Sequence, residues 1–334
     1  MQEAAYYTKL EGSVRCTLCP HMCVLMNDEL GKCRTRINKH GVLVSLAYAQ
    51  PCTVYVDPIE KKPLYHFLPG SKTLSIATGG CNLSCKNCQN HTISQASPTE
   101  VTVGIVSPEH VVEEALAYGC ASISYTYTDP VVYYEYMLAV ARIAHLKGLK
   151  NVMISAGYIN EEPLNALLPF LDAANIDLKC FDDHLYQKLC GIHLKPVLQT
   201  LKRLLANKVW LEITCLIIPQ YSDDKATIDR MVSWLVDNGF SKTPIHFNRF
   251  VPAHQLSHLN ATPTELLREL AEKAIVKGMK HVYVGNVKPH FYHNTNCPAC
   301  RQLLIERKGY EIEKKVNKKN ACRCCGQTLA GVWQ

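Results

Sequence analysis

The sequence contains no hydrophobic run that approaches the roughly 20 residues that span a bilayer. Residues 1–15 hold Glu3, Lys9 and Glu11 and lack an apolar core, so we expect neither a secretory peptide nor a membrane-spanning protein. There is no HExxH pairing of histidines, no Ser–His–Asp motif and no glycine loop long enough to cradle a phosphate. These absences favour a cytoplasmic protein and give no support to a zinc protease, a serine hydrolase or a nucleotide-phosphate enzyme.

The composition indicates a folded protein of modest charge. The 334 residues are 47% hydrophobic and 19% charged, which excludes a disordered chain and a collagen. The net charge is +7, and part of it lies in one C-terminal run of lysines, Lys314, Lys315, Lys318 and Lys319. No aromatic residues interleave this run, so we interpret it as the solvated face of a hairpin and rank a nucleic-acid patch below that.

Cysteine is abundant, with 17 residues, and most of them fall into three tight clusters. In a reduced cytoplasm, clustered cysteines are typical of metal ligands rather than disulfides. Each cluster is therefore a candidate metal site.

Between the outer clusters the sequence alternates strand-like and helix-like segments, which predicts parallel βα units. Amphipathic stretches such as 109–118, 131–147 and 227–238 separate the strands. The predicted strands are 74–78, 122–127, 151–155, 173–178, 209–217, 245–249 and 281–284. We therefore predict an α/β fold, a partial (βα) TIM-like barrel of residues 71–289. A Cys-rich metal-binding module (1–70) precedes it and a zinc ribbon (290–334) follows.

The central cysteines, Cys81, Cys85 and Cys88, form a C-x3-C-x2-C motif directly after the first predicted strand of the barrel. Three thiolates on one loop can bind three irons of a 4Fe–4S cluster and leave the fourth iron open. The alternative is a zinc site completed by His91. We favour the cluster because a barrel places its active site at the C-terminal ends of its strands.

Several further motifs support a family resemblance across nearly the whole chain. They are DPIEKKPLYHFLPG at 57–70, YTYTDP at 125–130, SAGYI at 155–159, NIDLK at 175–179, NTNCPAC at 294–300, LIER at 304–307 and GVW at 331–333. With the cysteine motif they resemble the AmmeMemoRadiSam system radical SAM proteins, relatives of the pyruvate formate-lyase activating enzyme. The resemblance implies S-adenosylmethionine (SAM) bound at the open iron, its cleavage to a 5′-deoxyadenosyl radical, and an external electron donor such as flavodoxin or ferredoxin.

The resemblance also implies contacts with SAM at the ends of three strands. Thr128 and Asp129 occupy the place of the GGE-type motif that meets the amino group, although the glycines are absent. Ser155 ends the third strand, where a ribose or substrate contact is expected. Asp177 and Lys179 match an Asp-Leu-Lys motif, in which Lys179 can pair with the SAM carboxylate. The alternative is that Asp177 and Lys179 form a structural ion pair.

Further cofactor contacts are expected from the later strands. Glu212 on the fifth strand is a candidate that faces into the barrel, and a solvated Glu at the strand edge is its alternative. The family is expected to have a His just before Pro252, where this sequence has Val251. If that His contacts the ribose, His246 or His254 has to replace it.

The C-terminal cysteines predict a zinc ribbon. Cys297, Cys300, Cys322 and Cys325 form two C-x2-C pairs, the signature of a closed tetrahedral site, and Cys324 is left over. The hairpin between the pairs has too small a core to fold alone, so the metal is expected to stabilise it.

The N-terminal cysteines, Cys16, Cys19, Cys23 and Cys33, lie within 18 residues of one another and predict a second metal site. We favour zinc, and a second iron–sulfur cluster that relays electrons is the alternative, because spacing alone does not separate the two metals.

Three hypotheses for function follow. The first is radical chemistry on a small-molecule substrate, started by hydrogen abstraction. The second is activation or modification of a partner protein, and the third is a non-enzymatic zinc protein that binds nucleic acid or protein.

Overall fold

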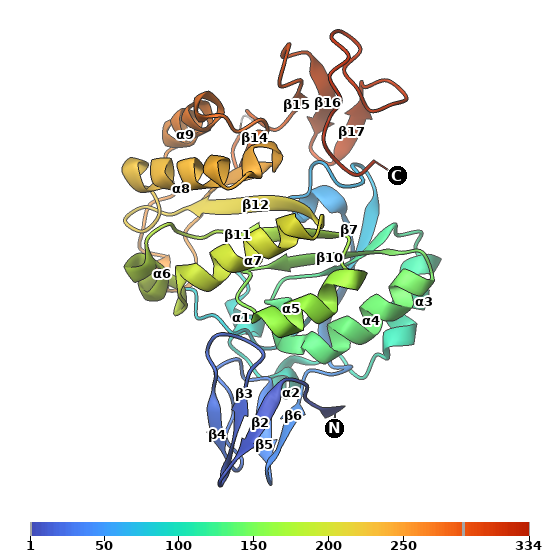
Figure 1. The fold of residues 1–334 in the computed structure, drawn as a ribbon, viewed down its shortest axis with the longest axis vertical. Helices are drawn as coiled ribbons and strands as arrows, with labels where there is room; N and C mark the ends of the chain where they lie inside the picture. Colours follow the sequence, from blue (N-terminus) through green and yellow to red (C-terminus); the bar gives the residue numbers. More distant parts are fainter. Residues whose placement is uncertain (1, 289–290, 334) are drawn as a thin grey trace.

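An eight-stranded sheet forms the centre of the structure, a computed structural model that describes residues 2–288 and 291–333 (Figure 1). Its parallel strands follow one another in chain order: β8 (Lys72–Thr78), β9 (Ser122–Tyr125), β10 (Lys150–Ser155), β11 (Ala173–Asp177), β12 (Trp210–Ile217), β13 (Ile245–Arg249) and β14 (Val282–Gly285). The remaining strand, β7 (Pro51–Pro58), pairs antiparallel with β8. The sheet begins at β7 and ends at β14, so it is open.

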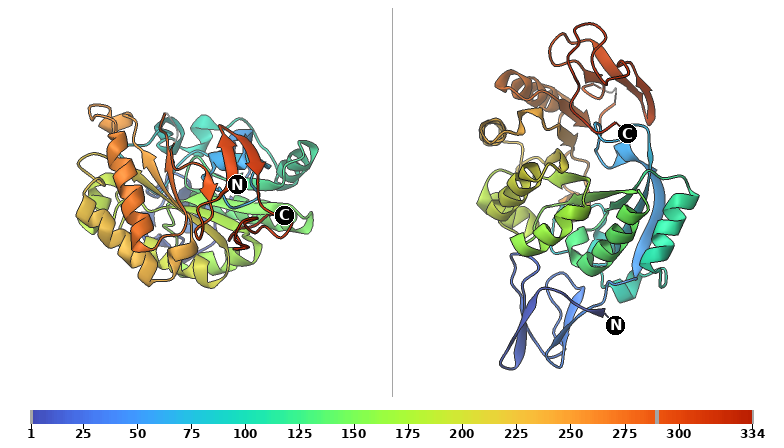
Figure 2. Two further views of the ribbon diagram at one scale, coloured as in Figure 1. Left: turned by 90° about the horizontal axis from the view of Figure 1, so that it is seen from above. Right: turned by 45° about the vertical axis from the view of Figure 1, so that its right-hand side comes forward.

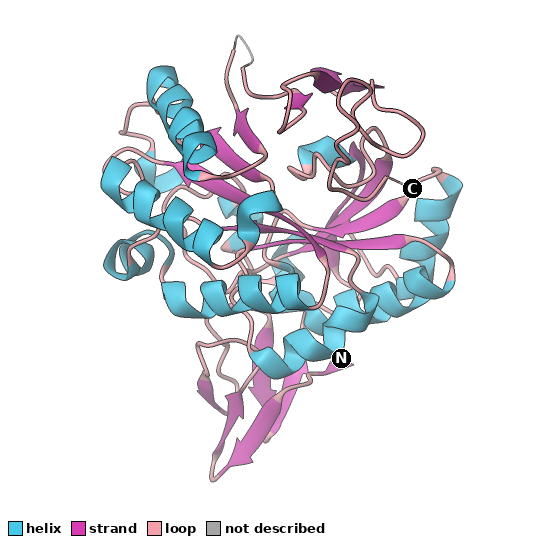
Figure 3. Ribbon diagram, turned by 45° about the horizontal axis from the view of Figure 1, so that its top comes forward, coloured by secondary structure: helices cyan, strands magenta, loops and turns pink. Residues whose placement is uncertain are grey.

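Helices connect the parallel strands and pack along the sheet (Figure 3). The longer ones are α3 (Pro108–Ala117), α4 (Tyr134–Leu146), α5 (Glu161–Leu167), α6 (Asp183–Cys190), α7 (Leu194–Ala206), α8 (Lys225–Asp237) and α9 (Thr264–Lys277). In α7 the apolar residues Val197, Leu201 and Leu204 recur with helical spacing, and all three are buried. Within the described residues, no helix combines the length and apolar character that a membrane crossing requires.

Two small β-structures lie at opposite ends of the molecule (Figures 1 and 2). Near the N-terminus, one sheet contains β2 (Tyr7–Leu10), β3 (Ser13–Cys16) and β4 (Val24–Met26), and another contains β1 (Gln2–Glu3), β5 (Arg36–Lys39) and β6 (Val42–Ser45). Their apolar residues join the main core. The C-terminal sheet of β15 (Thr295–Asn296), β16 (Leu303–Lys308) and β17 (Glu311–Lys314) has a separate small core.

The structure confirms the predicted α/β class, and each of the seven predicted strands appears within two residues of its predicted bounds. Strand β7 was not predicted. It belongs to the first 70 residues of the chain but extends the central sheet. The predicted boundary between residues 289 and 290 lies outside the described part of the chain.

Candidate active site

The loop after β8 carries Cys81, Cys85 and Cys88 at the C-terminal edge of the parallel strands. Backbone hydrogen bonds fix this loop from two sides. The amide of Cys81 donates to the carbonyl of Cys33 (3.2 Å), and the amides of Ser84 and Lys86 donate to the last residues of α6 at 3.0 and 2.9 Å. The loop conformation therefore depends on both the N-terminal module and helix α6 of the central α/β region.

Gly80 allows the loop to approach Cys33 and Thr35 of the N-terminal module. Its φ is +91°, in the left-handed region that favours glycine. A Cβ at this position would lie 2.5 Å from the carbonyl oxygen of Cys33 and 2.4 Å from the methyl group of Thr35. Any other residue at position 80 would push the N-terminal module away from the loop.

The three cysteines open into a cavity of about 250 Å³. The C-terminal ends of β8 to β11 surround it, together with residues of η1 (Ile59–Lys61) and its C-terminal neighbour. The residues that line it besides the cysteines include Lys61, Lys62, Asn90, Tyr127, Thr128, Asp129, Ser155, Asp177 and Lys179. The cavity thus collects five of the six predicted SAM contacts around the three thiols.

The three thiols of the loop are not part of a compact ligand group. In the described part of the chain, such a group is formed by the C-terminal cysteines, whose four sulfurs all lie within 4.8 Å of one another. Burial raises the pKa of Cys81 above its ordinary value, and a metal would have to displace its proton. His91, the alternative zinc ligand, donates from Nδ1 to the carbonyl of Cys88 (3.2 Å) and stacks on His254.

Asp129 and Ser155 connect the ends of two neighbouring strands. The buried Asp129 carboxylate accepts hydrogen bonds from Ser155 Oγ (3.0 Å), the Ala156 amide (2.9 Å) and the Val131 amide (3.1 Å). Burial raises the pKa of Asp129 despite these bonds. The side chain of Thr128 donates to the carbonyl of Thr78 (3.0 Å). These side chains shape the cavity wall, and the backbone of Thr128 remains the candidate for a cofactor contact.

Asp177 and Lys179 form an ion pair of 2.7 Å at the end of β11, and both side chains line the cavity. Burial alone would lower the pKa of Lys179, but the Asp177 carboxylate holds it well above the ordinary value. The ammonium group therefore stays protonated at neutral pH and faces the space next to the thiols.

Glu212 lies elsewhere, and we do not retain it as a SAM contact. It lies near the start of β12, at the opposite edge of the sheet from the cysteine loop. Its carboxylate is fully buried and accepts hydrogen bonds from the amides of Tyr65 (3.0 Å) and His66 (2.7 Å), from Trp210 Nε1 (3.1 Å) and from His246 Nε2 (2.7 Å). The same contact engages His246, so His246 does not reach the cavity either.

Replacing Glu212 with glutamine should destabilise the fold and leave SAM affinity unchanged. An amide cannot accept all the hydrogen bonds that the carboxylate accepts, and each buried donor without a partner costs free energy. We expect the free energy of unfolding in urea to fall by about 2–4 kcal/mol. Glu265→Gln, at an exposed side chain, is the matched control. A normal stability combined with weaker SAM binding would restore Glu212 to the cofactor site.

The sequence analysis did not identify Lys61 and Lys62 as cavity residues. Lys62 is almost completely buried, lies 4.3 Å from the centre of the Tyr127 ring, and pairs with Asp57 at 2.8 Å. Lys61 pairs with the other oxygen of Asp57, also at 2.8 Å. The signal that could have identified both lysines is the 57–70 motif itself, which packs several charges into a segment with no helix or strand pattern of its own.

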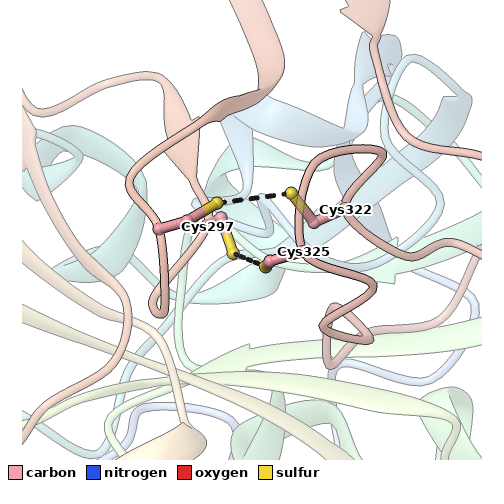
Figure 4. Close-up of side chains that lie close together, drawn as sticks. Cys297, Cys322 and Cys325 are labelled. Atoms are coloured by element: carbon pink, nitrogen blue, oxygen red, sulfur yellow. Dashed lines mark hydrogen bonds between the residues drawn. The ribbon is translucent and has the colours of Figure 1, made fainter.

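The C-terminal cysteines form a compact site that could bind a metal ion (Figure 4). The sulfurs of Cys297 and Cys325 are 3.5 Å apart, those of Cys300 and Cys322 are 3.6 Å apart, and all four lie within 4.8 Å. A tetrahedral zinc ion with Zn–S bonds of about 2.3 Å places its sulfurs roughly 3.8 Å apart. Cys324 is exposed and lies outside this group. The N-terminal cysteines, Cys16, Cys19, Cys23 and Cys33, line a separate, smaller cavity.

Comparisons with known proteins agree with this arrangement. The family model described as "Radical SAM superfamily" matches residues 75–232. The uncharacterized protein MJ0808 of Methanocaldococcus jannaschii is 44% identical over 333 residues, which cover 98% of this chain and 99% of that protein. The pyruvate formate-lyase 1-activating enzyme of Escherichia coli K12 is 23% identical over 169 residues, which cover 48% of this chain and 67% of that enzyme.

The chain also has weaker similarity to another activating enzyme and to a solved structure. The benzylsuccinate synthase activating enzyme of Thauera aromatica is 22% identical over 173 residues, which cover 48% of this chain and 52% of that enzyme. The crystal structure of Streptococcus suis SuiB bound to precursor peptide SuiA matches with a TM-score of 0.52 and 14% identity, over 69% of this chain and 51% of that one. At this identity the likeness concerns the fold alone. The cysteine loop, the central sheet and the relatives together show that the chain belongs to the radical SAM superfamily.

Proposed function

We propose that the protein is a radical SAM enzyme in which Cys81, Cys85 and Cys88 hold a 4Fe–4S cluster and the adjoining cavity binds SAM. The observation that carries this proposal is the opening of all three thiols into one cavity at the C-terminal edge of the sheet. With these groups bound, an electron from an external donor would pass through the cluster to SAM and break a carbon–sulfur bond, which would give methionine and a 5′-deoxyadenosyl radical able to abstract hydrogen from the substrate.

The chain's own residues would bind and orient SAM in this cavity. Lys179 presents an ammonium group that fits the SAM carboxylate, and Asp177 holds it in place. Ser155 and the backbone of Thr128 line the same wall. Because Asp129 is bonded to Ser155 and to the Ala156 amide, the ends of β9 and β10 keep a fixed spacing while ligands bind.

Lys61 and Lys62 favour a small anionic substrate. Two ammonium groups share the single carboxylate of Asp57, so this side of the cavity keeps an excess of positive charge. A small carboxylate or phosphate ester would match that charge. A partner protein is the second candidate for the substrate, since two of the relatives are activating enzymes. Flavodoxin or ferredoxin would be the external electron donor, in the cytoplasm.

Anaerobic turnover tests the proposal. The reconstituted protein with dithionite and SAM should release 5′-deoxyadenosine and methionine in equal amounts, and SAM should change the electron paramagnetic resonance (EPR) spectrum of the reduced cluster. A protein that carries the cluster but neither cleaves SAM nor responds to it would contradict the assignment. For the substrate, deuterium from labelled cell metabolites below 1 kDa, rather than from labelled protein, should enter 5′-deoxyadenosine.

The pH dependence of stability should report the buried Lys62. Burial lowers its pKa to about 8, although Asp57 acts in the opposite direction and the neighbouring Lys61 adds to the lowering. The unfolded chain then binds more protons at this residue than the folded chain between pH 8 and the ordinary lysine pKa near 10.5, so raising the pH through this window favours folding. Between pH 8 and pH 10, the free energy of unfolding in urea should rise by about 1–2 kcal/mol more in the wild type than in Lys62→Met.

The matched control is Lys72→Met, since Lys72 is exposed at the start of β8. It should keep the wild-type dependence on pH. Equal slopes in the wild type and in Lys62→Met would show that Lys62 does not titrate in this window.

A further inference from the structure

We propose that Cys16, Cys19, Cys23 and Cys33 bind a second 4Fe–4S cluster, with one thiolate on each iron, and not a zinc ion. This site is separate from the cavity of Cys81, Cys85 and Cys88, and it does not depend on the proposed reaction. With four ligands it would be closed to SAM, unlike the cluster of the candidate active site.

The spacing of the sulfurs carries this assignment. Around one zinc ion, four sulfurs lie roughly 3.8 Å apart, and the C-terminal group shows such contacts at 3.5 and 3.6 Å. Over residues 2–288 and 291–333, the C-terminal cysteines form a compact group whose sulfurs all lie within 4.8 Å of one another, and the N-terminal cysteines form no such group. A cubane needs a wider spacing than one zinc ion, because each sulfur binds a different iron. The N-terminal set therefore differs from the compact zinc-type group of the same chain.

The four N-terminal cysteines line a common cavity. They line a small space of about 20 Å³, which exceeds the 10–15 Å³ that one water molecule needs by the same measure. Four apolar side chains, Leu18, Leu25, Val131 and Val132, form part of the remaining wall, together with polar and charged residues. Four sulfurs in contact with one ion would leave no such space between them.

Polar groups in the wall point to an anionic occupant. Arg36 lines the cavity with its side chain only 1% exposed, and its Nη1 lies 3.6 Å from Cys16 Sγ. Its Nε has no hydrogen-bond partner, although Glu135 and the carbonyl of Ala5 engage the other nitrogens. The Thr35 hydroxyl lies 3.2 Å from Cys33 Sγ and donates its proton to the carbonyl of Val132 at 2.9 Å. A buried cation that donates to a ligand sulfur stabilises a centre with four thiolates and tunes its reduction potential.

The site lies against the catalytic loop. The carbonyl of Cys33 accepts the hydrogen bond from the Cys81 amide, and Asn82, from the same loop, lines the N-terminal cavity. His21 Nε2 lies 2.7 Å from the carbonyl of Asn82. Ligands of the two centres are therefore joined by a single backbone hydrogen bond.

A triple variant of the full chain, Cys81→Ala, Cys85→Ala and Cys88→Ala, tests this proposal with the N-terminal ligands intact. After anaerobic reconstitution with iron, sulfide and zinc, we expect about four irons and four sulfides per chain, and about one zinc at the C-terminal site. The reduced protein should give a cluster EPR signal that SAM does not change. No iron and about two zinc ions per chain would overturn the proposal.

Two additions to the triple variant locate the iron. Adding Cys16→Ser and Cys33→Ser should remove it, whereas the matched pair Cys52→Ser and Cys120→Ser should leave it in place. Iron retained after the first addition would overturn the proposal. Should the first addition fail to fold, the metal content of the triple variant still decides. Because the triple variant lacks the catalytic cysteines, this result does not depend on whether the wild type cleaves SAM.

Discussion

Replacing Cys85 with alanine will abolish SAM cleavage and lower the iron content by about four atoms per chain. The three thiols of the loop are the whole protein ligand set of the proposed catalytic cluster, so that the loss of one leaves two irons without a protein ligand. Cys85 is the middle residue of the motif and lines the cavity directly. The measurements are iron and sulfide per chain, 5′-deoxyadenosine released after reduction, and the effect of SAM on the EPR spectrum.

Cys120→Ala is the control for this prediction, because Cys120 is also buried but lies at the opposite end of the strands, just before β9. It should retain iron, SAM cleavage and the spectral response. If Cys85→Ala still releases 5′-deoxyadenosine at the wild-type rate, the loop is not the site of cleavage and the proposed function is wrong.

We propose that the four C-terminal cysteines bind zinc, so that replacing Cys300 with serine should release the ion and unfold residues 295–333. The separate core of this region is small, and two of its residues, Cys297 and Cys322, also belong to the candidate metal site. The other buried core residues are Leu304, Ile305, Val316 and Leu329. Structural zinc supplies about 10–16 kcal/mol to the folding of comparable small domains, far more than such a core can replace. We expect the loss of about one zinc per chain and rapid proteolysis after residue 295.

The unfolding should also destabilise the central sheet. Thr295 contacts the buried hydroxyl of Tyr283 at 2.7 Å, Arg307 donates to the carbonyl of Tyr65 at 2.8 Å, and the carbonyl of Ala330 lies 2.7 Å from His66 Nδ1. Losing these contacts exposes the buried end of the central sheet, so the central α/β region should also unfold at a lower urea concentration.

Cys324→Ser separates metal loss from a general effect of the substitution. Cys324 lies between two ligands in sequence, is exposed and is outside the metal group. It should keep the zinc and the resistance to proteolysis. A Cys300→Ser protein that resists proteolysis without metal would show that the ribbon folds without the ion.

The parallel part of the sheet could be predicted because each of its strands is marked by a pattern within a short stretch of sequence. Each parallel strand is a short apolar run bounded by helix signals, and chain order gives spatial order when every connection is a βα unit. β7 escaped prediction for a physical reason. It is an edge strand with exposed Tyr55 and Val56, so its pattern lacks the continuous apolar character of the buried strands.

The sequence prediction included the cavity residues that follow parallel strands and missed cavity residues that come from elsewhere. Thr128, Ser155 and Asp177 share the cavity because carboxyl ends of parallel strands meet at one edge. Lys62 reaches the same cavity through the antiparallel β7–β8 pair, which no local pattern indicated. Glu212 was misassigned because we considered its type and face but not its place near the start of a strand.

The hydrogen bond between Cys33 and Cys81 bears on how the chain can be divided. The family model covers residues 75–232. The cysteine motif within that span is held by a hydrogen bond to the carbonyl of Cys33, which lies more than 40 residues before the span begins. A fragment trimmed to the matched span would lose this anchor, the edge strand β7, and both strands beyond β12. The part of the chain that is needed to hold the site in shape is therefore longer than the span that the family model matches.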